Sequence, residues 1–560
     1  MRIFLAQQNY HIGNFESNVA KIIHAIQEAK RAGGDLIVFS ELSVCGYPPR
    51  DFLEFDDFIA QCNQAVEKIK PYSKEIGVIV GAPVVNAKKE GKDLHNAAIA
   101  MWDGQIQAVV HKTCLPTYDV FDEYRYFEPA AEWQTVLFKG KKLAITICED
   151  IWNLGDNPLY TICPMDRLMP EQPDIMINLS ASPFDYTHTE DRKAILKRNV
   201  LKYKIPIIYC NAVGSQTEIV FDGGSMVMDG DANLIKQLSL FEEQLDYVDW
   251  NEEIGFESAV LTQGALLPDS ELSPKTLDIS LGIQEIHDAL ILGIRDYFSK
   301  MGFTKAILGS SGGIDSALTL ALACEALGAE NVHAELMPSP YSTSHSVDDA
   351  VELSKRLGNP YDILPIKNIY EAFLTELSPL FKDLPFSLAE ENIQSRTRGN
   401  LLMAIANKFG YILLNTSNKS ELATGYGTLY GDMAGGIGVL GDCYKLQVYA
   451  LAKYINRDQE IIPANIIAKP PSAELRPGQK DSDSLPEYEI LDPILYQYIE
   501  RRQGPLEIKA MGYDAPLVDR ILRLVNNNEY KRNQFCPIIR VSPKAFGMGR
   551  RMPIVGKYLG

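Results

Sequence analysis

Short apolar runs recur along the first half of the chain, and segments with helical spacing of apolar residues separate some of them. The runs cover residues 3–6, 36–39, 78–81, 97–101, 143–147, 175–179, 207–209 and 225–228, and the helical segments cover residues 18–31 and 192–202. Apolar runs of this length are typical of strands that are buried on both faces. The pattern predicts an α/β domain with covered sheets over residues 1–250.

A second α/β pattern begins near residue 280. A helix with an apolar face is expected over residues 283–299, and strand-like runs follow at 306–309, 332–337, 361–366 and 411–415. Because helical segments separate these runs, residues 280–560 are predicted to form a Rossmann-like, doubly wound parallel sheet. Residues 251–279 are acidic and rich in turn formers, which indicates a connector. Residues 469–488 are rich in Pro, Ser and Asp, which predicts a mobile loop.

Composition narrows the class of protein. The 560 residues are 46% hydrophobic and 23% charged, as in ordinary globular proteins. No apolar run approaches the roughly 18 residues that cross a bilayer, and the N-terminus lacks the features of a signal peptide. We therefore expect a soluble, cytoplasmic protein with no membrane partner. The net charge of −19 disfavours a nucleic-acid partner. Nine cysteines without a CxxC pair argue against a disulfide framework or a zinc site.

The sharpest motif follows the run at 306–309, where a glycine-rich loop leads directly into a helical segment. It comprises Gly309, Ser310, Ser311, Gly312, Gly313, Ile314, Asp315 and Ser316. Glycines let the backbone approach phosphate closely, and the free N–H groups at a helix N-terminus attract an anion. A carboxylate in such a loop repels phosphate, which suggests a Mg²⁺ ion between Asp315 and the phosphates. A glycine-rich turn with a capping serine is the alternative interpretation.

The loop lacks the GK[ST] ending of a Walker motif and resembles the SGGxDS loop of the pyrophosphatase-type ATP family. Further segments lie at 391–396, 411–421, 425–432, 441–445 and 529–532. Together they resemble the NAD synthetase family over residues 280–560. That resemblance implies that ATP, as co-substrate, is cleaved between its α and β phosphates. It also implies that a substrate oxygen is adenylated and that ammonia then displaces AMP.

The same resemblance assigns site residues in the second half. Asp315 and Glu421 would bind Mg²⁺, and Thr416, Lys445 and Ser472 would contact ATP together with residues 309–316. The expected contacts to deamido-NAD are Asn392, Glu421, Tyr426, Gly427, Thr428, Leu429, Asp432 and Lys531. Each has a structural alternative when taken alone: Asn392 as a helix cap, or Glu421 and Lys531 as solvated charges.

Three polar residues in the first half lie at or near the ends of strand-like runs. They are Glu41, Lys112 and Cys148. A carboxylate, an amine and a thiol that meet in space could cleave an amide, with Glu41 as the base, Cys148 as the nucleophile and Lys112 stabilising the oxyanion. A cysteine after an apolar run is more often a core residue, so spacing alone leaves this open.

Residues 1–250 resemble the nitrilase superfamily, whose fold is an α-β-β-α sandwich. More narrowly, the stretches KTCLPTYDVFDEYRYF and NLSASPF are similar to the glutaminase domain of the glutamine-dependent NAD synthetase family. This implies a glutamine site of Tyr118, Glu123, Ser182 and His188, in which Glu123 supports Lys112. The family usually has Lys or Arg at the position of His188, so either a protonated His188 or a nearby cation such as Arg192 would hold the glutamine carboxylate.

The resemblances together imply a two-domain enzyme. Its glutaminase domain releases ammonia from L-glutamine, and its synthetase domain uses ATP to convert deamido-NAD to NAD. The family likeness also implies a homo-oligomer through the synthetase domains. Other amidotransferases fit less well, since asparagine synthetase needs Cys at position 2, where this chain has Arg2. GMP synthetase uses a Cys-His-Glu glutaminase. A non-catalytic nucleotide sensor is the alternative from another class.

Overall fold

The computed structural model describes residues 1–88, 90–154, 158–251, 255–256, 261, 274–382 and 384–558. The chain divides into two compact units. Unit 1 comprises Met1–Phe184 and His188–Leu272, and unit 2 comprises Asp185–Thr187 and Ser273–Gly560. Most of the predicted connector at 251–279 lies outside the described residues. Within the described ranges, no helix combines the length and the apolar character needed to span a membrane.

Unit 1 contains two large sheets and a β-hairpin. The seven-stranded sheet has the order β15-β14-β1-β2-β3-β4-β5 and the six-stranded sheet the order β13-β12-β9-β8-β7-β6. The first sheet is formed by β1 (Arg2–Gln7), β2 (Leu36–Phe39), β3 (Gly77–Val85), β4 (Leu94–Trp102), β5 (Gln105–His111), β14 (Gln244–Asn251) and β15 (Gly255–Phe256). The second is formed by β6 (Val136–Phe138), β7 (Lys141–Ile147), β8 (Ile175–Ser180), β9 (Ile207–Asn211), β12 (Met226–Met228) and β13 (Leu234–Gln237). The hairpin pairs β10 (Val213–Gln216) with β11 (Ile219–Asp222).

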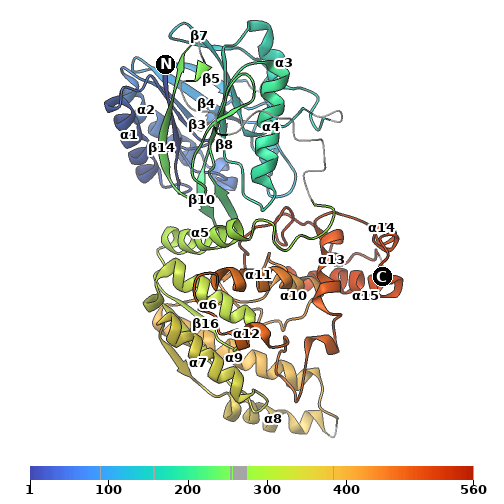
Figure 1. The fold of residues 1–560 in the computed structure, drawn as a ribbon. Helices are drawn as coiled ribbons and strands as arrows, with labels where there is room; N and C mark the ends of the chain where they lie inside the picture. Colours follow the sequence, from blue (N-terminus) through green and yellow to red (C-terminus); the bar gives the residue numbers. More distant parts are fainter. Residues whose placement is uncertain are drawn as a thin grey trace. The chain divides into compact units, whose positions relative to one another are not determined.

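Alternating side chains on the strands build three apolar layers in unit 1. On β1, Ile3 and Leu5 enter the layer between the two sheets, whereas Phe4 and Ala6 pack against α1 (Phe15–Arg31) and α2 (Asp56–Ile69). The second sheet is covered on its outer face by α3 (Pro164–Leu168) and α4 (His188–Tyr203). Figure 1 shows the two helix pairs on opposite sides of the sheets. The order is helix, sheet, sheet, helix, which confirms the predicted sandwich.

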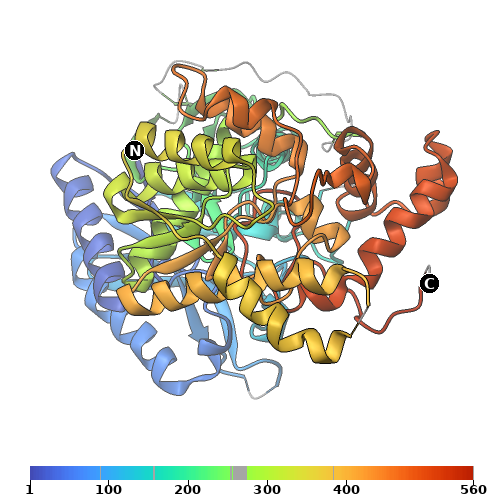
Figure 2. The same ribbon diagram turned by 90° about the horizontal axis from the view of Figure 1, so that it is seen from below.

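Unit 2 is built around a five-stranded parallel sheet of order β18-β17-β16-β19-β20. The strands are β16 (Ala306–Gly309), β17 (Val332–Leu336), β18 (Tyr361–Ile363), β19 (Ile412–Asn415) and β20 (Ile437–Gly438). Helices packed around it include α5 (Ile283–Met301), α6 (Ile314–Leu327), α7 (Ser344–Leu357), α8 (Lys367–Phe381), α9 (Leu388–Phe409) and α11 (Lys445–Ile455). Leu402 of α9 packs on Ile307 and Leu413. Figure 2 shows α8 and α9 side by side. The doubly wound prediction is confirmed.

A second apolar cluster in unit 2 joins its later helices. These are α10 (Lys419–Thr424), α13 (Tyr488–Ile499), α14 (Pro505–Ala510) and α15 (Ala515–Asn527), followed by α16 (Glu529–Arg532). Residues 469–480 contain no helix or strand, and a 3₁₀ turn over Asp481–Asp483 precedes α13. This agrees with the predicted loop in its lack of regular structure.

Two edge strands, β5 and β18, differ from what the apolar pattern of the sequence predicts. β5 is an edge strand whose first residues, Gln105 to Gln107, are exposed, so it has no apolar run to reveal it. β18 ends at Ile363, three residues before the predicted end, because the chain leaves the sheet toward α8.

Candidate active sites

A fully buried lysine stands at the centre of the polar cluster in unit 1. Lys112 directly follows β5, and its ammonium donates to Glu41 Oε1 at 2.7 Å and to Glu123 Oε1 at 2.8 Å. The side chains of Lys112 and Glu41 have no exposure, and that of Glu123 is 5% exposed. Glu41 follows β2, so three segments distant in sequence converge here. The structure therefore brings together two of the three predicted catalytic residues.

Amide and hydroxyl groups hold the two carboxylates beside Lys112. Asn96 of β4 donates to Glu41 at 2.7 Å and to Glu123 at 3.3 Å, and the hydroxyl of Tyr47 donates to Glu123 at 2.8 Å. Burial alone lowers the pKa of Lys112, but Glu123 and Glu41 outweigh it and raise that pKa well above its ordinary value. The lysine is therefore a cation at neutral pH.

Cys148, the third predicted catalytic residue, begins the 3₁₀ turn that follows β7. Its φ of 43° lies in the left-handed region, which is strained for a residue with a side chain. Burial, followed by the charge of Glu41, raises the pKa of the thiol well above its ordinary value. Lys112 acts on the same thiol in the opposite direction, so all three predicted residues lie within electrostatic range of one another. An unassisted thiol here stays protonated and needs a base.

Asp150 joins the two segments that carry Lys112 and Cys148. Its carboxylate accepts from the backbone N–H groups of Thr113 at 3.0 Å and Cys114 at 2.8 Å, and from that of Ile147 at 3.0 Å. One buried side chain thus fixes the residues after Lys112 against the residue before Cys148. Burial raises the pKa of Asp150 to about 6, so it is largely ionised at neutral pH.

The residue after the thiol forms an unpredicted polar pocket with Tyr118. Tyr118 donates to both carboxylate oxygens of Glu149 at 2.9 Å, and Tyr160 donates to one of them at 3.2 Å. Burial raises the pKa of Glu149 to about 7. The predicted glutamine residue Tyr118 therefore lies beside a carboxylate that is adjacent to Cys148 in the chain.

Ser182 and His188, both predicted to bind glutamine, lie in contact. Ser182 Oγ is 2.9 Å from His188 Nε2, and the imidazole stacks on Trp152 with ring centroids 5.0 Å apart. Arg192, considered as a substitute cation, is buried and forms an ion pair with Asp222. Its guanidinium also donates to the carbonyl of Gly223. Arg192 is therefore already committed to a buried ion pair.

The glycine-rich loop of unit 2 runs from the end of β16 to the start of α6, as predicted. Gly312 has φ +75°, and a Cβ there would lie 2.1 Å from the carbonyl oxygen of Ser346, so only glycine fits. Ser316 Oγ accepts from the backbone N–H of Ser311 at 3.3 Å and donates to the carbonyl of Gly313 at 3.0 Å. The hydroxyl of Ser316 therefore fixes the conformation of the loop. The backbone N–H groups at the N-terminus of α6 can then bind an anion.

Lys445 ties the loop to α10. Its ammonium pairs with Asp315 and lies 3.7 Å from Glu421, and Asn418 donates to Asp315 at 2.8 Å. Burial, and then Asp315, raise the pKa of Glu421 to about 8. Burial also raises the pKa of Asp481, and the negative charge of Asp315 acts in the same direction. Three carboxylates therefore gather around one ammonium, and this oxygen-rich donor set suits Mg²⁺.

A cavity of about 280 Å³ opens beside this cluster. Most of the predicted nucleotide residues line it: Gly309, Ser310, Ser311, Gly313, Ile314, Asp315, Ser316, Thr416, Glu421, Tyr426, Asp432, Lys445 and Ser472. Gly312 is not among its lining residues. The structure therefore gathers most of the predicted ATP set around a single cavity.

The other predicted deamido-NAD residues are not among the cavity's lining residues. They are Asn392, Gly427, Thr428, Leu429 and Lys531. Thr428 Oγ1 donates to Asn392 Oδ1 at 2.8 Å, and its N–H donates to Asp432 at 2.6 Å. Lys531 donates to the carbonyls of Gly425 at 2.7 Å and Gly427 at 2.8 Å. These contacts connect the segment around 425–432 to α9 and α16.

Three residues of these clusters were not predicted from the sequence: Asn96, Glu149 and Asp481. Asn96 directly precedes the apolar run of β4 and is almost fully buried, so a polar residue beside a strand-like run was the available signal. Glu149 directly follows Cys148 and has no sequence signal of its own. Asp481 lies in the stretch that was predicted to be a loop.

Comparisons with known proteins match both units. The carbon-nitrogen hydrolase family matches residues 2–255, and the NAD synthase family matches residues 286–535. The glutamine-dependent NAD(+) synthetase of Synechocystis sp. is 44% identical over 99% of this chain and 98% of its own length. That of Thermotoga maritima is 41% identical over 100% of this chain and 99% of its own length.

The solved structure of glutamine-dependent NAD+ synthetase from Acinetobacter baumannii, in complex with ADP, is similar in both fold and sequence. It has a TM-score of 0.76 and 38% identity, covering 99% of this chain and 98% of its own. Similarity at this level over the whole length shows the family. The chain therefore belongs to the glutamine-dependent NAD(+) synthetase family, with a carbon-nitrogen hydrolase domain followed by an NAD synthase domain.

Proposed function

We propose that this chain is an enzyme that makes NAD from deamido-NAD, using ammonia released from L-glutamine and cleaving ATP to AMP and diphosphate. The observation that supports it is the presence of two constellations in one chain. One is the cluster of Glu41, Lys112 and Cys148, and the other is the loop at 309–316 with Lys445. We assign residues 1–250 to a glutaminase domain, 251–279 to a connector and 280–560 to a synthetase domain.

In the glutaminase domain, Glu41 takes the proton of Cys148, whose raised pKa makes a base necessary. The thiolate attacks the amide carbon of glutamine, and Lys112 stabilises the oxyanion. The C–N bond then breaks as the proton held by Glu41 passes to the nitrogen, which leaves as ammonia. Water then hydrolyses the thioester, with Glu41 again accepting a proton. Glu123 acts through Lys112, because its carboxylate holds the ammonium in place at 2.8 Å.

Glutamine is a zwitterion, so its site needs partners for both charges. We assign its ammonium to Glu149, whose carboxylate is positioned by the hydroxyl of Tyr118, 2.9 Å from both of its oxygens. We assign its carboxylate to Ser182 and to a protonated His188, since Arg192 is already paired with Asp222. A histidine in place of Lys or Arg holds the carboxylate less firmly.

In the synthetase domain, the backbone N–H groups of the loop hold the ATP phosphates, supported by Thr416, Lys445 and Ser472. Asp315 and Glu421 would hold Mg²⁺, which neutralises phosphate charge when bound. The nicotinate carboxylate of deamido-NAD forms a bond to the α-phosphorus as diphosphate leaves, and ammonia displaces AMP from the adenylate. Asn392, Glu421, the segment 426–429, Asp432 and Lys531 position the dinucleotide.

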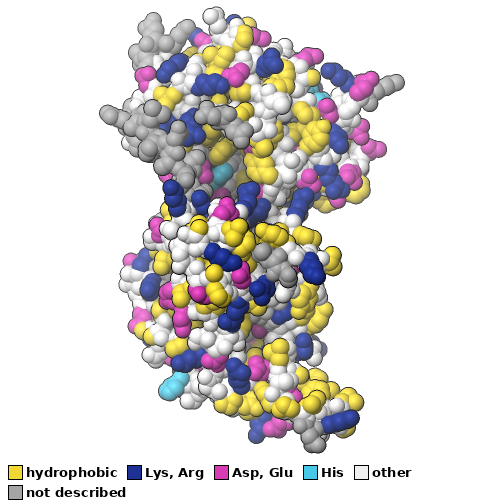
Figure 3. Space-filling model, turned by 90° about the vertical axis from the view of Figure 1, so that its right-hand side faces the viewer, with side chains coloured by type: hydrophobic (Ala, Val, Ile, Leu, Met, Phe, Trp, Pro, Cys, Tyr) yellow, Lys and Arg dark blue, Asp and Glu magenta, His cyan; other side chains and the backbone are white. Residues whose placement is uncertain are grey.

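We further propose that the enzyme is a homo-oligomer that pairs through unit 2. Only Tyr370 of α8 is buried, whereas Ile369, Phe373 and Leu380 are 39%, 44% and 74% exposed. Their spacing places them on one stripe of the helix. Figure 3 shows hydrophobic side chains gathered at the lower end of unit 2, where Figure 1 places α8. An exposed apolar patch of this kind marks an interface, here with a second copy.

We place the enzyme in the cytoplasm. All nine cysteines are free thiols, as suits a reducing compartment, and ATP is available there.

Replacing the nucleophile tests the division of labour between the two domains. Cys148→Ala removes the thiol and abolishes NAD synthesis from glutamine, while synthesis from added ammonia continues at a rate within about twofold of the wild type. Both rates are measured by NAD and AMP formation. Cys163→Ala, which removes a thiol outside the cluster, retains both activities. Loss of the ammonia-driven rate in Cys148→Ala would contradict the proposal.

The raised pKa of Glu149 predicts a pH-dependent affinity for glutamine. Below about pH 7 the carboxyl takes a proton and no longer attracts the ammonium of glutamine. The KM for glutamine therefore rises as the pH falls, by up to about tenfold per pH unit. Glu149→Gln raises the KM and removes this dependence. The exposed control Glu132→Gln behaves like the wild type; an identical pH profile in Glu149→Gln would disprove the assignment.

The raised pKa of Glu421 makes a second prediction, for Mg²⁺ binding to the whole chain. Below about pH 8 the carboxyl is protonated, so the metal must displace a proton to bind. Calorimetry in buffers of different ionisation enthalpy should show proton release and a weakening affinity as the pH falls below 8. Glu421→Gln loses the proton release and binds Mg²⁺ at least about tenfold more weakly. Glu489→Gln, which changes an exposed glutamate of unit 2, is the control, and equal binding by both variants would refute the assignment.

A charge placed on the exposed stripe of α8 tests the oligomer. Phe373→Glu lowers the mass measured by sedimentation equilibrium toward that of one chain, because a buried unpaired charge opposes association. Leu137→Glu introduces the same charge at a 62% exposed leucine of β6 in unit 1 and leaves the mass unchanged. A wild-type protein that sediments as a monomer would rule the proposal out.

A further inference from the structure

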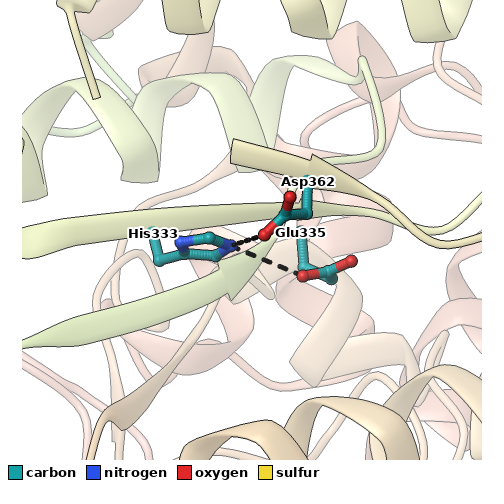
Figure 4. A group of neighbouring side chains, drawn as sticks. All are labelled: His333, Glu335 and Asp362. Atoms are coloured by element: carbon teal, nitrogen blue, oxygen red, sulfur yellow. Dashed lines mark ion pairs between the residues drawn. The ribbon is translucent and has the colours of Figure 1, made fainter. Parts of the chain in front are cut away.

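Three side chains at the edge of the unit 2 sheet converge on one point. His333 and Glu335 are two residues apart on β17, so they project from the same face of the sheet. Asp362 lies on the neighbouring edge strand β18, opposite Glu335 in the parallel register. Figure 4 shows both carboxylates directed at the same ring nitrogen of His333. Strand register thus brings an imidazole and two carboxylates together.

The spacing of the three ligand atoms matches a tetrahedral metal site. His333 Nε2 is 3.5 Å from Glu335 Oε2 and 3.3 Å from Asp362 Oδ2, and all three atoms lie within 4.8 Å of one another. Around a tetrahedral ion with ligand bonds of about 2.0–2.2 Å, neighbouring ligand atoms are about 3.3–3.6 Å apart. Charge-assisted hydrogen bonds are shorter, at about 2.7–2.9 Å. The two measured separations are those expected of atoms that share a cation.

Glu335 supplies an independent reason for a cation at this point. Its side chain is 3% exposed, and among the described residues no hydrogen-bond donor contacts its carboxylate. Within the described part of the chain, its carboxylate forms one ion pair, the 3.5 Å contact with His333 inside the cluster. A single imidazole N–H cannot donate well to two carboxylates at once. A buried carboxylate in this position is costly unless a positive charge compensates it.

The surroundings give the cluster an oriented ring and an open side. Tyr411 stacks on His333 with ring centroids 5.9 Å apart and an interplanar angle of 15°, which restricts rotation of the imidazole. The side chain of Asp362 is 76% exposed, so an ion can enter from solvent and keep a water ligand. The site therefore offers three protein ligands and one open position.

We propose that His333, Glu335 and Asp362 bind a divalent transition-metal ion of the Zn²⁺ class, with water as the fourth ligand. An imidazole with two carboxylates suits Zn²⁺, whereas Mg²⁺ prefers oxygen ligands in octahedral geometry. The absence of paired cysteines does not bear on this site, because none of its ligands is a thiol. A bound ion would tie the edge strand β18 to β17. The carbonyl of Glu335 on β17 accepts from the N–H of Ser310 in the phosphate loop at 2.9 Å.

Zn²⁺ titration of the full chain tests the proposal. The protein is stripped with a chelator and titrated with Zn²⁺ against a chromophoric competitor, in saturating Mg²⁺ so that Asp315 and Glu421 do not contribute. The wild type should bind one more tight Zn²⁺ ion per chain than His333→Gln. Asp362→Asn should weaken that ion at least about 100-fold, as expected for loss of a direct ligand. His345→Gln, which changes an exposed histidine of α7, should bind like the wild type.

Co²⁺ provides a readout that does not depend on stoichiometry. Tetrahedral Co²⁺ absorbs strongly in the visible, and the band should appear in the wild type and in His345→Gln but not in His333→Gln or Asp362→Asn. Because Asp362 is exposed, its variant keeps the test decisive even if His333→Gln does not fold. Equal Zn²⁺ binding by the wild type and Asp362→Asn, or no tetrahedral band in the wild type, would overturn the proposal.

Discussion

A lysine ammonium with no solvent exposure can persist only where carboxylates balance it, and this constraint shapes both units. Removing one partner of such a buried pair costs roughly 3–5 kcal/mol, because the remaining charge is uncompensated. In unit 1 the requirement holds Glu41 and Glu123 within 2.8 Å of Lys112. The contacts that keep the protein folded there are therefore the same contacts that align its base and its oxyanion donor.

Unit 2 meets the same constraint twice. Lys445 pairs with Asp315 and Glu421, and Lys419, two residues before Glu421, pairs with Asp442 at 2.9 Å and Glu500 at 2.7 Å. The second cluster anchors the start of α10 and so fixes where Glu421 points. In the cluster around Lys445, the negative charge of the carboxylates exceeds the single positive charge of the ammonium. This excess would be balanced by one more cation. An acidic chain can thus bind anionic nucleotides through a local excess of donors and metal rather than through its overall field.

Much of the fold follows from local sequence pattern. β2 and β16 have the predicted bounds, because buried strands in covered sheets appear as uninterrupted apolar runs. β5 was missed because an exposed edge strand has no such run. Two site residues could be predicted from the same local pattern. Glu41 and Cys148 are polar residues that come at the ends of apolar strands. Glu149 and Asp481 were missed because a carboxylate in a turn is usually a solvated surface residue.

The features that follow from the sequence alone are local ones. Gly312 has a backbone conformation that only glycine adopts without strain. The loop after β16 leads directly into the N-terminus of a helix. Which charges lie in contact depends on the packing of the whole fold. Lys112 lies 71 residues from Glu41, and His333 meets Asp362 through the register of two parallel strands. Strand order and register arise from the packing of whole sheets, so the partners of a buried charge cannot be read from its neighbours in the chain.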